Sequence, residues 1–202
     1  AARPNTFDRD LRLDRLAFNV LRWKLTGRGT PAQSPLTIQG FIRSGPEQDR
    51  PDLQFQASHV SYAARPWFPL WRKGAGHEIS AGTLLLNPAS RGRVSLASAG
   101  PHALPRILLN FLAEEPDRRA MREAIRITRR LFNSEPARPY IARELAPGKD
   151  ADSDDALDAW LRETVISAAH PTSTCAMGTD GNAVVDAQLR VRGIEGLRVA
   201  DC

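Results

Sequence analysis

The residues best suited to chemistry lie between positions 170 and 202 of this 202-residue chain. His170 opens the segment on a proline-bounded loop, and Cys175 and Gly178 follow among small and hydroxyl residues. This setting suits a closely approached substrate or cofactor, and a neutral imidazole accepts a proton readily near neutral pH. A glycine turn then leads into an apolar stretch that we expect to form a buried strand with Asp201 at its tip. On the residues alone, a loop histidine is more often structural than catalytic, and Asp201 is typical of a turn.

The remaining histidines and the cysteines indicate no further site. His59, His77 and His102 have no other histidine, cysteine or carboxylate at metal-ligand spacing, so we predict no metal site. The two cysteines, Cys175 and Cys202, are too few for a disulfide framework and are expected to be reduced.

The composition is that of a globular protein with a basic balance. The chain is 42% hydrophobic and 25% charged, with a net charge of +5 and a pI near 9.9. Clustered cations would favour nucleic acid, but here the cations are scattered, apart from one group between residues 118 and 130. That group lies among apolar residues at helical spacing, so we interpret it as the solvated outer face of a helix and expect no nucleic-acid partner.

The ends and the hydropathy of the chain bear on its context. The sequence contains no apolar run of 18 residues, so we expect no transmembrane segment. It begins without an initiator methionine or a signal pattern, and we expect it to start inside a longer protein. Its localisation cannot be read, with the cytoplasm as the default expectation.

Hydrophobic periodicity predicts an α+β fold, with an antiparallel or mixed sheet flanked by helices. The predicted helices cover residues 8–25 and 116–132, and a third helix opens at Ser153, a good N-cap. The predicted strands cover residues 36–44, 53–60, 79–87, 93–97 and 107–112. An aromatic loop at 62–71 forms either a plug over the sheet edge or the wall or lid of a substrate pocket.

The C-terminal motif resembles that of the glucose-methanol-choline (GMC) flavoprotein oxidoreductases. The family pattern is close to His-Pro-x-Gly-Thr-Cys-x-Met-Gly, and the matching residues here are His170, Pro171, Thr174, Cys175, Met177 and Gly178. Ser173 stands where glycine is usual, so the backbone angle there matters, because glycine tolerates positive φ and serine does so at a cost. Segments 23–29, 40–44, 51–55 and 87–94 are similar to the choline-dehydrogenase side of the family.

The resemblance implies the C-terminal part of an FAD enzyme that oxidises a small alcohol. His170 would be the catalytic base, with hydride passing to the flavin, while Ala200 and Asp201 would lie against FAD. Residues 1–168 would form the substrate-binding domain, and residues 169–202 would carry the His loop and return to an FAD-binding domain. The sequence contains no Gly-x-Gly-x-x-Gly fingerprint, so the main part of that domain, and with it activity, is expected to need a remainder of the same enzyme.

Two alternatives stay open at this point. Relatives with this architecture can cleave cyanohydrins without net redox change, so a hydroxynitrile-lyase-like enzyme is one. The other is a non-enzymatic basic module that binds through the arginine-rich helix.

Overall fold

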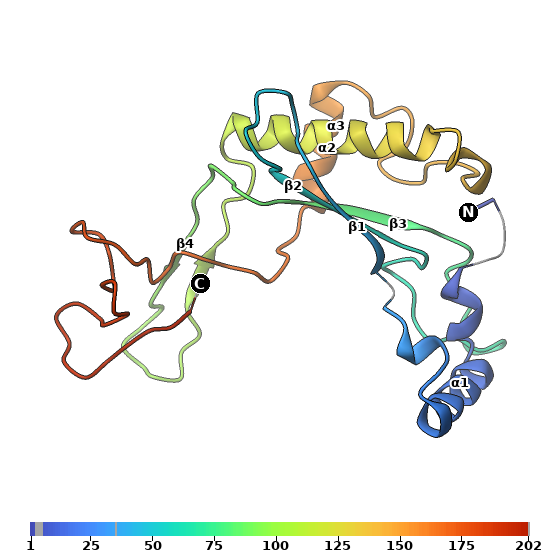
Figure 1. Cartoon of the computed structure of the whole chain (residues 1–202), viewed down its shortest axis with the longest axis horizontal. Helices are drawn as coiled ribbons and strands as arrows, with labels where there is room; N and C mark the ends of the chain where they lie inside the picture. The colour runs from blue at the N-terminus through green and yellow to red at the C-terminus, as the bar shows by residue number, and fades with distance from the viewer. Residues whose placement is uncertain (3–5, 35, 202) are drawn as a thin grey trace. The chain divides into compact units, whose positions relative to one another are not determined.

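The computed structural model describes residues 1–2, 6–34 and 36–201 (Figure 1). The chain divides into two compact units, unit 1 (Ala1–Ala89 with Glu114–Glu163) and unit 2 (Ser90–Ala113 with Thr164–Cys202). The elements in chain order are η1 (Phe7–Leu11), α1 (Leu13–Thr26), η2 (Thr30–Ala32), β1 (Leu36–Ile42), β2 (Leu53–Ser58), β3 (Ser80–Leu85), β4 (Arg93–Ser95), β5 (Arg106–Leu108), α2 (Glu115–Asn133), η3 (Arg138–Tyr140) and α3 (Asp154–Thr164), where η marks a 3-10 helix.

Unit 1 is built on an antiparallel sheet in the order β1-β2-β3. Along the central strand β2, Leu53, Phe55 and Ala57 alternate with half-exposed residues and are buried. Leu53 packs against Ala120 and Ala124 of α2, and these small side chains let the helix approach the sheet closely. Helix α2 therefore covers one face of the sheet (Figure 1).

The six arginines of the 118–130 group do not form one solvated face: Arg119 and Arg130 are well exposed, but the side chains of Arg122 and Arg129 are only 7% and 17% exposed, so our interpretation was wrong for the centre of the group. Each has a carboxylate partner within 4.0 Å: Arg118 with Glu115, Arg119 with Glu47, Arg122 with Asp158, Arg126 with Asp154, Arg129 with Glu144 and Arg130 with Glu123. Several of these carboxylates belong to α3 or to the segment before it. Arg119, Arg122, Arg126 and Arg129 thus tie α2 to the rest of unit 1, whereas the Arg130 pair lies within the helix.

Arg122 is the buried centre of this network, with a side chain only 7% exposed. Its guanidinium donates to both oxygens of Asp158, at 2.9 and 3.1 Å, and to Glu115 at 2.6 Å. Burial disfavours the charged form, but the hydrogen bonds that Arg122 donates to Glu115 and Asp158 outweigh it and raise the pKa of Arg122. The pKa of Glu115 is correspondingly lowered by its hydrogen bonds with Arg122 and Arg118.

Helix α3 begins as its sequence predicts. Ser153 caps it, because the Ala156 N–H donates to Ser153 Oγ at 3.2 Å and the Leu157 N–H donates to the Ser153 carbonyl at 3.0 Å. Leu157 and Leu161, one turn apart, are buried. The helix ends at Thr164, six residues before His170.

The helix expected at 8–25 is interrupted near its start. Arg12 is extended, with φ −65° and ψ 127°, and separates η1 from α1. It forms a bridge to Trp67 of the aromatic loop, whose indole N–H donates to the Asp8 carbonyl at 2.8 Å. Gly27 ends α1 in the left-handed conformation that favours glycine, with φ 68°.

Unit 2 contains a second, separate sheet, in which β4 pairs antiparallel with β5. The sequence led us to expect β4 in the same sheet as the first three strands. Gly92 favours the observed pairing, since a Cβ there would lie 2.3 Å from the Leu108 carbonyl oxygen. Among the described residues of unit 2, only Ala183 and Val185 are buried.

In the part of the chain that the structure describes, every helix is too short or too polar to cross a bilayer.

Candidate active-site loop

His170 lies on an irregular segment that follows α3, and its side chain is exposed. Two residues near it have left-handed backbones, Ala169 with φ 59° and Ser173 with φ 72°. The Ala169 N–H donates to Ser167 Oγ at 3.0 Å, which fixes the turn before the histidine. His170 therefore lies on a bend, with a residue of left-handed backbone conformation before it and another after it in the chain.

The conformation of Ser173 explains why glycine is usual at this position. A φ of 72° is open to glycine at no steric cost, whereas a residue with a Cβ gives up about 1 kcal/mol or more there. Ser173 adopts it nonetheless, with its Oγ 3.4 Å from Thr172 Oγ1. Ser173 thus has the left-handed conformation that glycine favours.

Backbone hydrogen bonds hold the second half of the motif. The Val184 and Val185 N–H groups donate to the Ala176 carbonyl at 2.9 and 3.2 Å, and the Gly178 N–H donates to the Val185 carbonyl at 3.1 Å. Val185 is 1% exposed and is the best-packed side chain of unit 2. Cys175, which precedes Ala176 in the sequence, is half-buried and carries a free thiol.

Arg192 clamps this loop, a role that we did not predict from the sequence. Its guanidinium donates to the Asp180 carbonyl at 2.8 Å and to the Gly178 carbonyl at 2.7 Å. Arginine presents several donors in a rigid fork, so one side chain can hold two carbonyls of a turn. Arg192 lies outside the motif residues named above, which gave no signal of this role.

Asp186 organises the return of the chain toward its end. Its Oδ1 accepts from the Gln188 and Arg190 N–H groups at 2.9 and 3.0 Å, and its Oδ2 accepts from Arg190 Nε at 2.8 Å. The backbone hydrogen bond from Arg190 is the main reason why the pKa of Asp186 is lowered. Arg190 also forms an antiparallel bridge with Arg198, which leads the chain to Ala200.

Ala200 and Asp201 are exposed and lie in the same unit as His170. The stretch before them was expected to form a buried strand, and this prediction was wrong. Leu197 is exposed, and among the described residues of the stretch only the isolated bridge at Arg198 is formed, because no described segment of unit 2 covers them. The role of Ala200 and Asp201 toward a cofactor stays a prediction.

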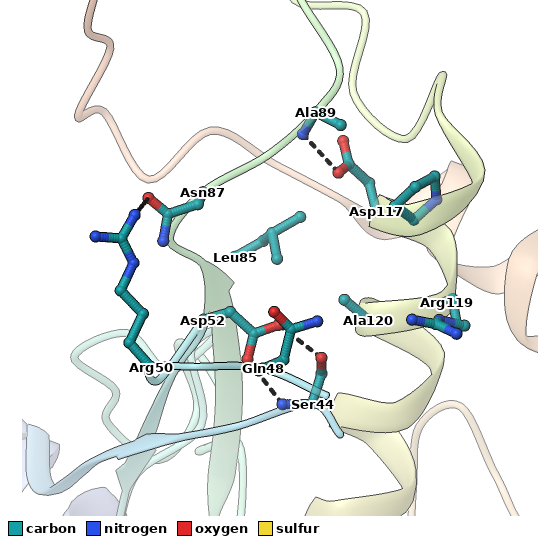
Figure 2. A pocket seen from close by; sticks show the side chains of 11 residues that line it. Ser44, Gln48, Arg50, Asp52, Leu85, Asn87, Ala89, Asp117, Arg119 and Ala120 are labelled. Carbon is teal, nitrogen blue, oxygen red and sulfur yellow. Dashed lines mark hydrogen bonds between the residues drawn. The ribbon is translucent and has the colours of Figure 1, made fainter. Parts of the chain in front are cut away.

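The structure also contains a polar cavity of about 240 Å³, which lies wholly in unit 1. Figure 2 shows the side chains that line it, from the connection between β1 and β2, from the end of β3 and the segment after it, and from the start of α2. Its lining residues are Ser44, Gln48, Arg50, Asp52, Leu85, Asn87, Ala89, Pro116, Asp117, Arg119 and Ala120. None of the predicted site residues is among them.

The two buried carboxylates of this cavity already have structural partners. Asp52 accepts from the Ser44 N–H at 2.7 Å and from Ser44 Oγ at 2.6 Å, which closes the β1–β2 hairpin. Asp117 accepts from the Ala89 N–H at 2.7 Å, which joins the end of the β3 segment to α2. We therefore interpret the cavity as a structural feature of unit 1, and we consider the His170 loop the candidate site of the chemistry.

The described residues contain no group of three or more histidine, cysteine or carboxylate side chains placed to hold a metal ion.

Comparison with known proteins places both units in context. A family model described as "GMC oxidoreductase" matches residues 88–202. The chain is 39% identical over 179 residues to the oxygen-dependent choline dehydrogenase of Pseudomonas fluorescens (strain SBW25), which covers 89% of this chain and 31% of that protein. The enzyme of the same name from Yersinia pseudotuberculosis serotype IB is 38% identical, covering 90% of this chain and 31% of its own length.

Solved structures give a consistent picture. A formate oxidase covers 97% of this chain and 38% of its own, with a TM-score of 0.80 and 25% identity. Pyridoxine 4-oxidase from Mesorbium loti covers 79% of this chain and 31% of its own, with a TM-score of 0.67 and 25% identity. The chain spans about a third of the length of the curated relatives that it matches.

Proposed function

Because this chain belongs to the GMC oxidoreductase family, we propose that it is the C-terminal, substrate-binding part of an FAD-dependent enzyme that oxidises a small alcohol at its CH–OH group. The choline dehydrogenase relatives align along nearly all of it, which supports an alcohol as the donor. FAD is named for the formate oxidase of Aspergillus oryzae RIB40, one of the structural neighbours.

The observation that carries the proposal is the conformation of the His170 motif. Its sequence differs from the family pattern at Ser173, yet Ser173 keeps a φ that only glycine adopts freely. A substitution that leaves a strained turn in place is expected where the position of the neighbouring side chain matters. The side chain that this turn presents is the exposed imidazole of His170.

His170 acts as the base in this proposal. An alcohol carbon cannot release hydride cheaply while its oxygen keeps the proton, so the imidazole accepts that proton as the C–H bond breaks. The left-handed residues beside it and the Arg192 clamp orient the loop that carries the ring. Cys175 is half-buried and serves the packing of the loop, whereas Met177, which we assign no chemical role, is exposed.

The chemical groups of Ala200 and Asp201 in unit 2 suit a bound flavin nucleotide. Asp201 offers a carboxylate and Ala200 a backbone amide to cofactor hydroxyls and phosphates, and both are exposed. FAD, when bound, would supply the acceptor for the hydride. Unit 2 buries only Ala183 and Val185 among its described residues, which supports our assignment of segment 169–202 to an FAD-binding domain completed by the remainder of the enzyme.

The alternatives receive less support. The arginines of α2 are engaged by carboxylates of the same unit, which disfavours a nucleic-acid module built on that helix. A lyase on the same architecture would leave the flavin oxidised when substrate is added. Anaerobic mixing with alcohol separates the two enzyme classes, because an oxidoreductase bleaches its flavin absorbance.

The test uses the flavin-loaded enzyme that contains this chain. His170→Ala should lower the rate of flavin reduction by alcohol about 10²- to 10⁴-fold, the usual scale for a lost acid–base group. His102→Ala, a second exposed histidine of unit 2, is the matched control and should reduce its flavin at the wild-type rate. An unchanged rate in His170→Ala removes this residue from the mechanism.

A further inference from the structure

Four short segments of unit 2 form one ladder of backbone hydrogen bonds. Hydrogen bonds join residues 176–178 to 184–186, residues 184–186 to 189–192, and residues 189–192 to 197–199. The ladder begins just after the loop that carries His170 and ends directly before Ala200 and Asp201. All of these residues belong to unit 2, so their relative placement is a property of one compact unit.

Val185 lies at the centre of the ladder. It is 1% exposed and forms a parallel bridge with Met177 and an antiparallel bridge with Val191. The Arg192 N–H donates to the Val184 carbonyl at 3.0 Å, which continues the pairing beyond Val191. Because these hydrogen bonds fix the register of the segments, the two ends of the ladder are held in a defined relation to each other.

The loop that carries His170 depends on this ladder for its placement. Among the described residues, 170–175 form no backbone hydrogen bond with another segment. The first tie to the ladder is the Ala176 carbonyl, which accepts from the N–H groups of Val184 and Val185 at 2.9 and 3.2 Å. A displacement of this part of the ladder would therefore also displace the imidazole.

The side chain of Arg192 reinforces the ladder at this point. Its guanidinium donates to the Gly178 carbonyl at 2.7 Å and to the Asp180 carbonyl at 2.8 Å. Arg192 thus holds two segments at once, because its backbone N–H is bonded to Val184 while its side chain holds the turn at residues 178–180. A side chain without the guanidinium fork would keep the first contact and lose the second.

We propose that Arg192 is a positioning residue, which places His170 relative to the end of the chain at Ala200 and Asp201. The inference rests on the proposed function, in which the imidazole accepts the alcohol proton. Proton acceptance by the base and departure of the hydride require the base and the cofactor in a fixed relation, and a displacement of about 1 Å can lower a rate by up to about 100-fold. Arg192 acts on the reaction through His170.

Arg192→Met in the flavin-loaded enzyme tests the proposal. Methionine keeps the backbone N–H bond to Val184, and Arg192 is exposed, so the ladder and the bound flavin should be retained. The rate of anaerobic flavin reduction should fall about tenfold, because the base is less well placed. The dissociation constant of the alcohol should change less than about twofold, since ground-state binding is not affected. The alcohol is whichever of choline, ethanol and benzyl alcohol reduces the wild-type flavin fastest.

Two comparisons separate a positioning role from a merely structural one. In the His170→Ala background, Arg192→Met should cause no further loss of rate, because the side chain that it positions is gone. Arg198→Met is the matched control: the Arg198 Nε donates to the Gln188 carbonyl at 3.3 Å, away from the His170 loop, and this variant should reduce its flavin at the wild-type rate. The inference is overturned if Arg192→Met slows the His170→Ala enzyme as much as it slows wild type, or if the control is equally slow.

Amide hydrogen exchange in the same enzyme gives a readout that needs no turnover. Arg192→Met should speed exchange across residues 176–185 about tenfold and leave α2 unchanged. Unchanged exchange across 176–185 would overturn the inference, because the guanidinium would then hold nothing. If His170→Ala reduces its flavin at the wild-type rate, the proposed function fails and this inference with it. If His170→Ala is slow but Arg192→Met is as fast as wild type, only this inference is overturned.

Discussion

Replacement of Arg122 should show that the arginines of α2 stabilise the fold from inside it. The Arg122 and Asp158 side chains are 7% and 12% exposed, so their pair is largely withdrawn from water. Removal of one partner from such a pair leaves the other charge buried and costs about 3–5 kcal/mol. Glu115 and Asp154, the other partners of Arg122, are both 58% exposed and can be rehydrated, so their loss adds little.

The variant of choice is Arg122→Met, which keeps the aliphatic stem and removes only the charge. We expect a loss near the lower end of that range, about 3 kcal/mol. For a chain of this size that corresponds to a fall in Tm of about 6–12 °C. Thermal and urea unfolding followed by far-UV circular dichroism measure it, because α2 and α3 supply much of the helical signal.

Two further variants decide how the loss is interpreted. Arg130→Ala removes a pair whose arginine is 65% exposed, and it should cost less than about 1 kcal/mol. Arg122→Met combined with Asp158→Leu replaces both charges and should recover most of the stability, since an apolar pair in place of a buried ion pair is often neutral. If Arg122→Met costs no more than Arg130→Ala, the buried pair contributes nothing and the reasoning is wrong.

The remaining predictions concern the His170 loop and the response to acid. Ser173→Gly should change the free energy of unfolding by less than about 1 kcal/mol. Ser173→Val should accelerate amide hydrogen exchange across residues 169–178, because valine strongly disfavours positive φ. Equal exchange in both variants would contradict the strained turn. The pKa of Glu115, Asp154 and Asp186 is lowered in the folded chain, so the unfolded state binds more protons at low pH, and the free energy of unfolding should fall as the pH drops through about 4. Burial lowers the pKa of His59, so the free energy of unfolding should already begin to fall as the pH drops below 6.5, the ordinary pKa of histidine. Urea unfolding across this pH range checks both effects, and a free energy of unfolding that does not change with pH would count against them.

Local periodicity was enough to predict the elements but not all their pairings. The strands, α2 and α3 formed within a few residues of the predicted ranges, because alternation, helical spacing and the Ser153 cap are written in adjacent residues. The pairing of β4 with β5 instead of the first sheet depends on the close approach of Gly92 to Leu108, a contact between distant segments. No local pattern encodes such a contact.

The candidate site, like the fold, could be predicted from the sequence only in part. The importance of the backbone at residue 173 could be predicted from the motif, because a missing glycine marks the φ that the position needs. The Arg192 clamp could not, since it acts on carbonyls 12 and 14 residues earlier in the chain. The exposure of Leu197 was mispredicted for a related reason, because burial depends on which layer covers a stretch and its own hydrophobicity does not decide that.

The distribution of charge shows why a run of cations is a poor guide to a binding surface. The dense arginines of α2 lie in segment 114–163, which contains ten cations and twelve carboxylates. Asp158, a partner of Arg122, and Asp154, the partner of Arg126, come 36 and 28 residues later in the chain. The cations of residues 6–28 and 60–78 are sparser along the sequence, but few carboxylates accompany them. Attraction for an anionic partner follows the charge that remains after internal pairing. On that criterion the arginines of α2 are poor candidates for attracting an anionic partner, because carboxylates of unit 1 already pair with them.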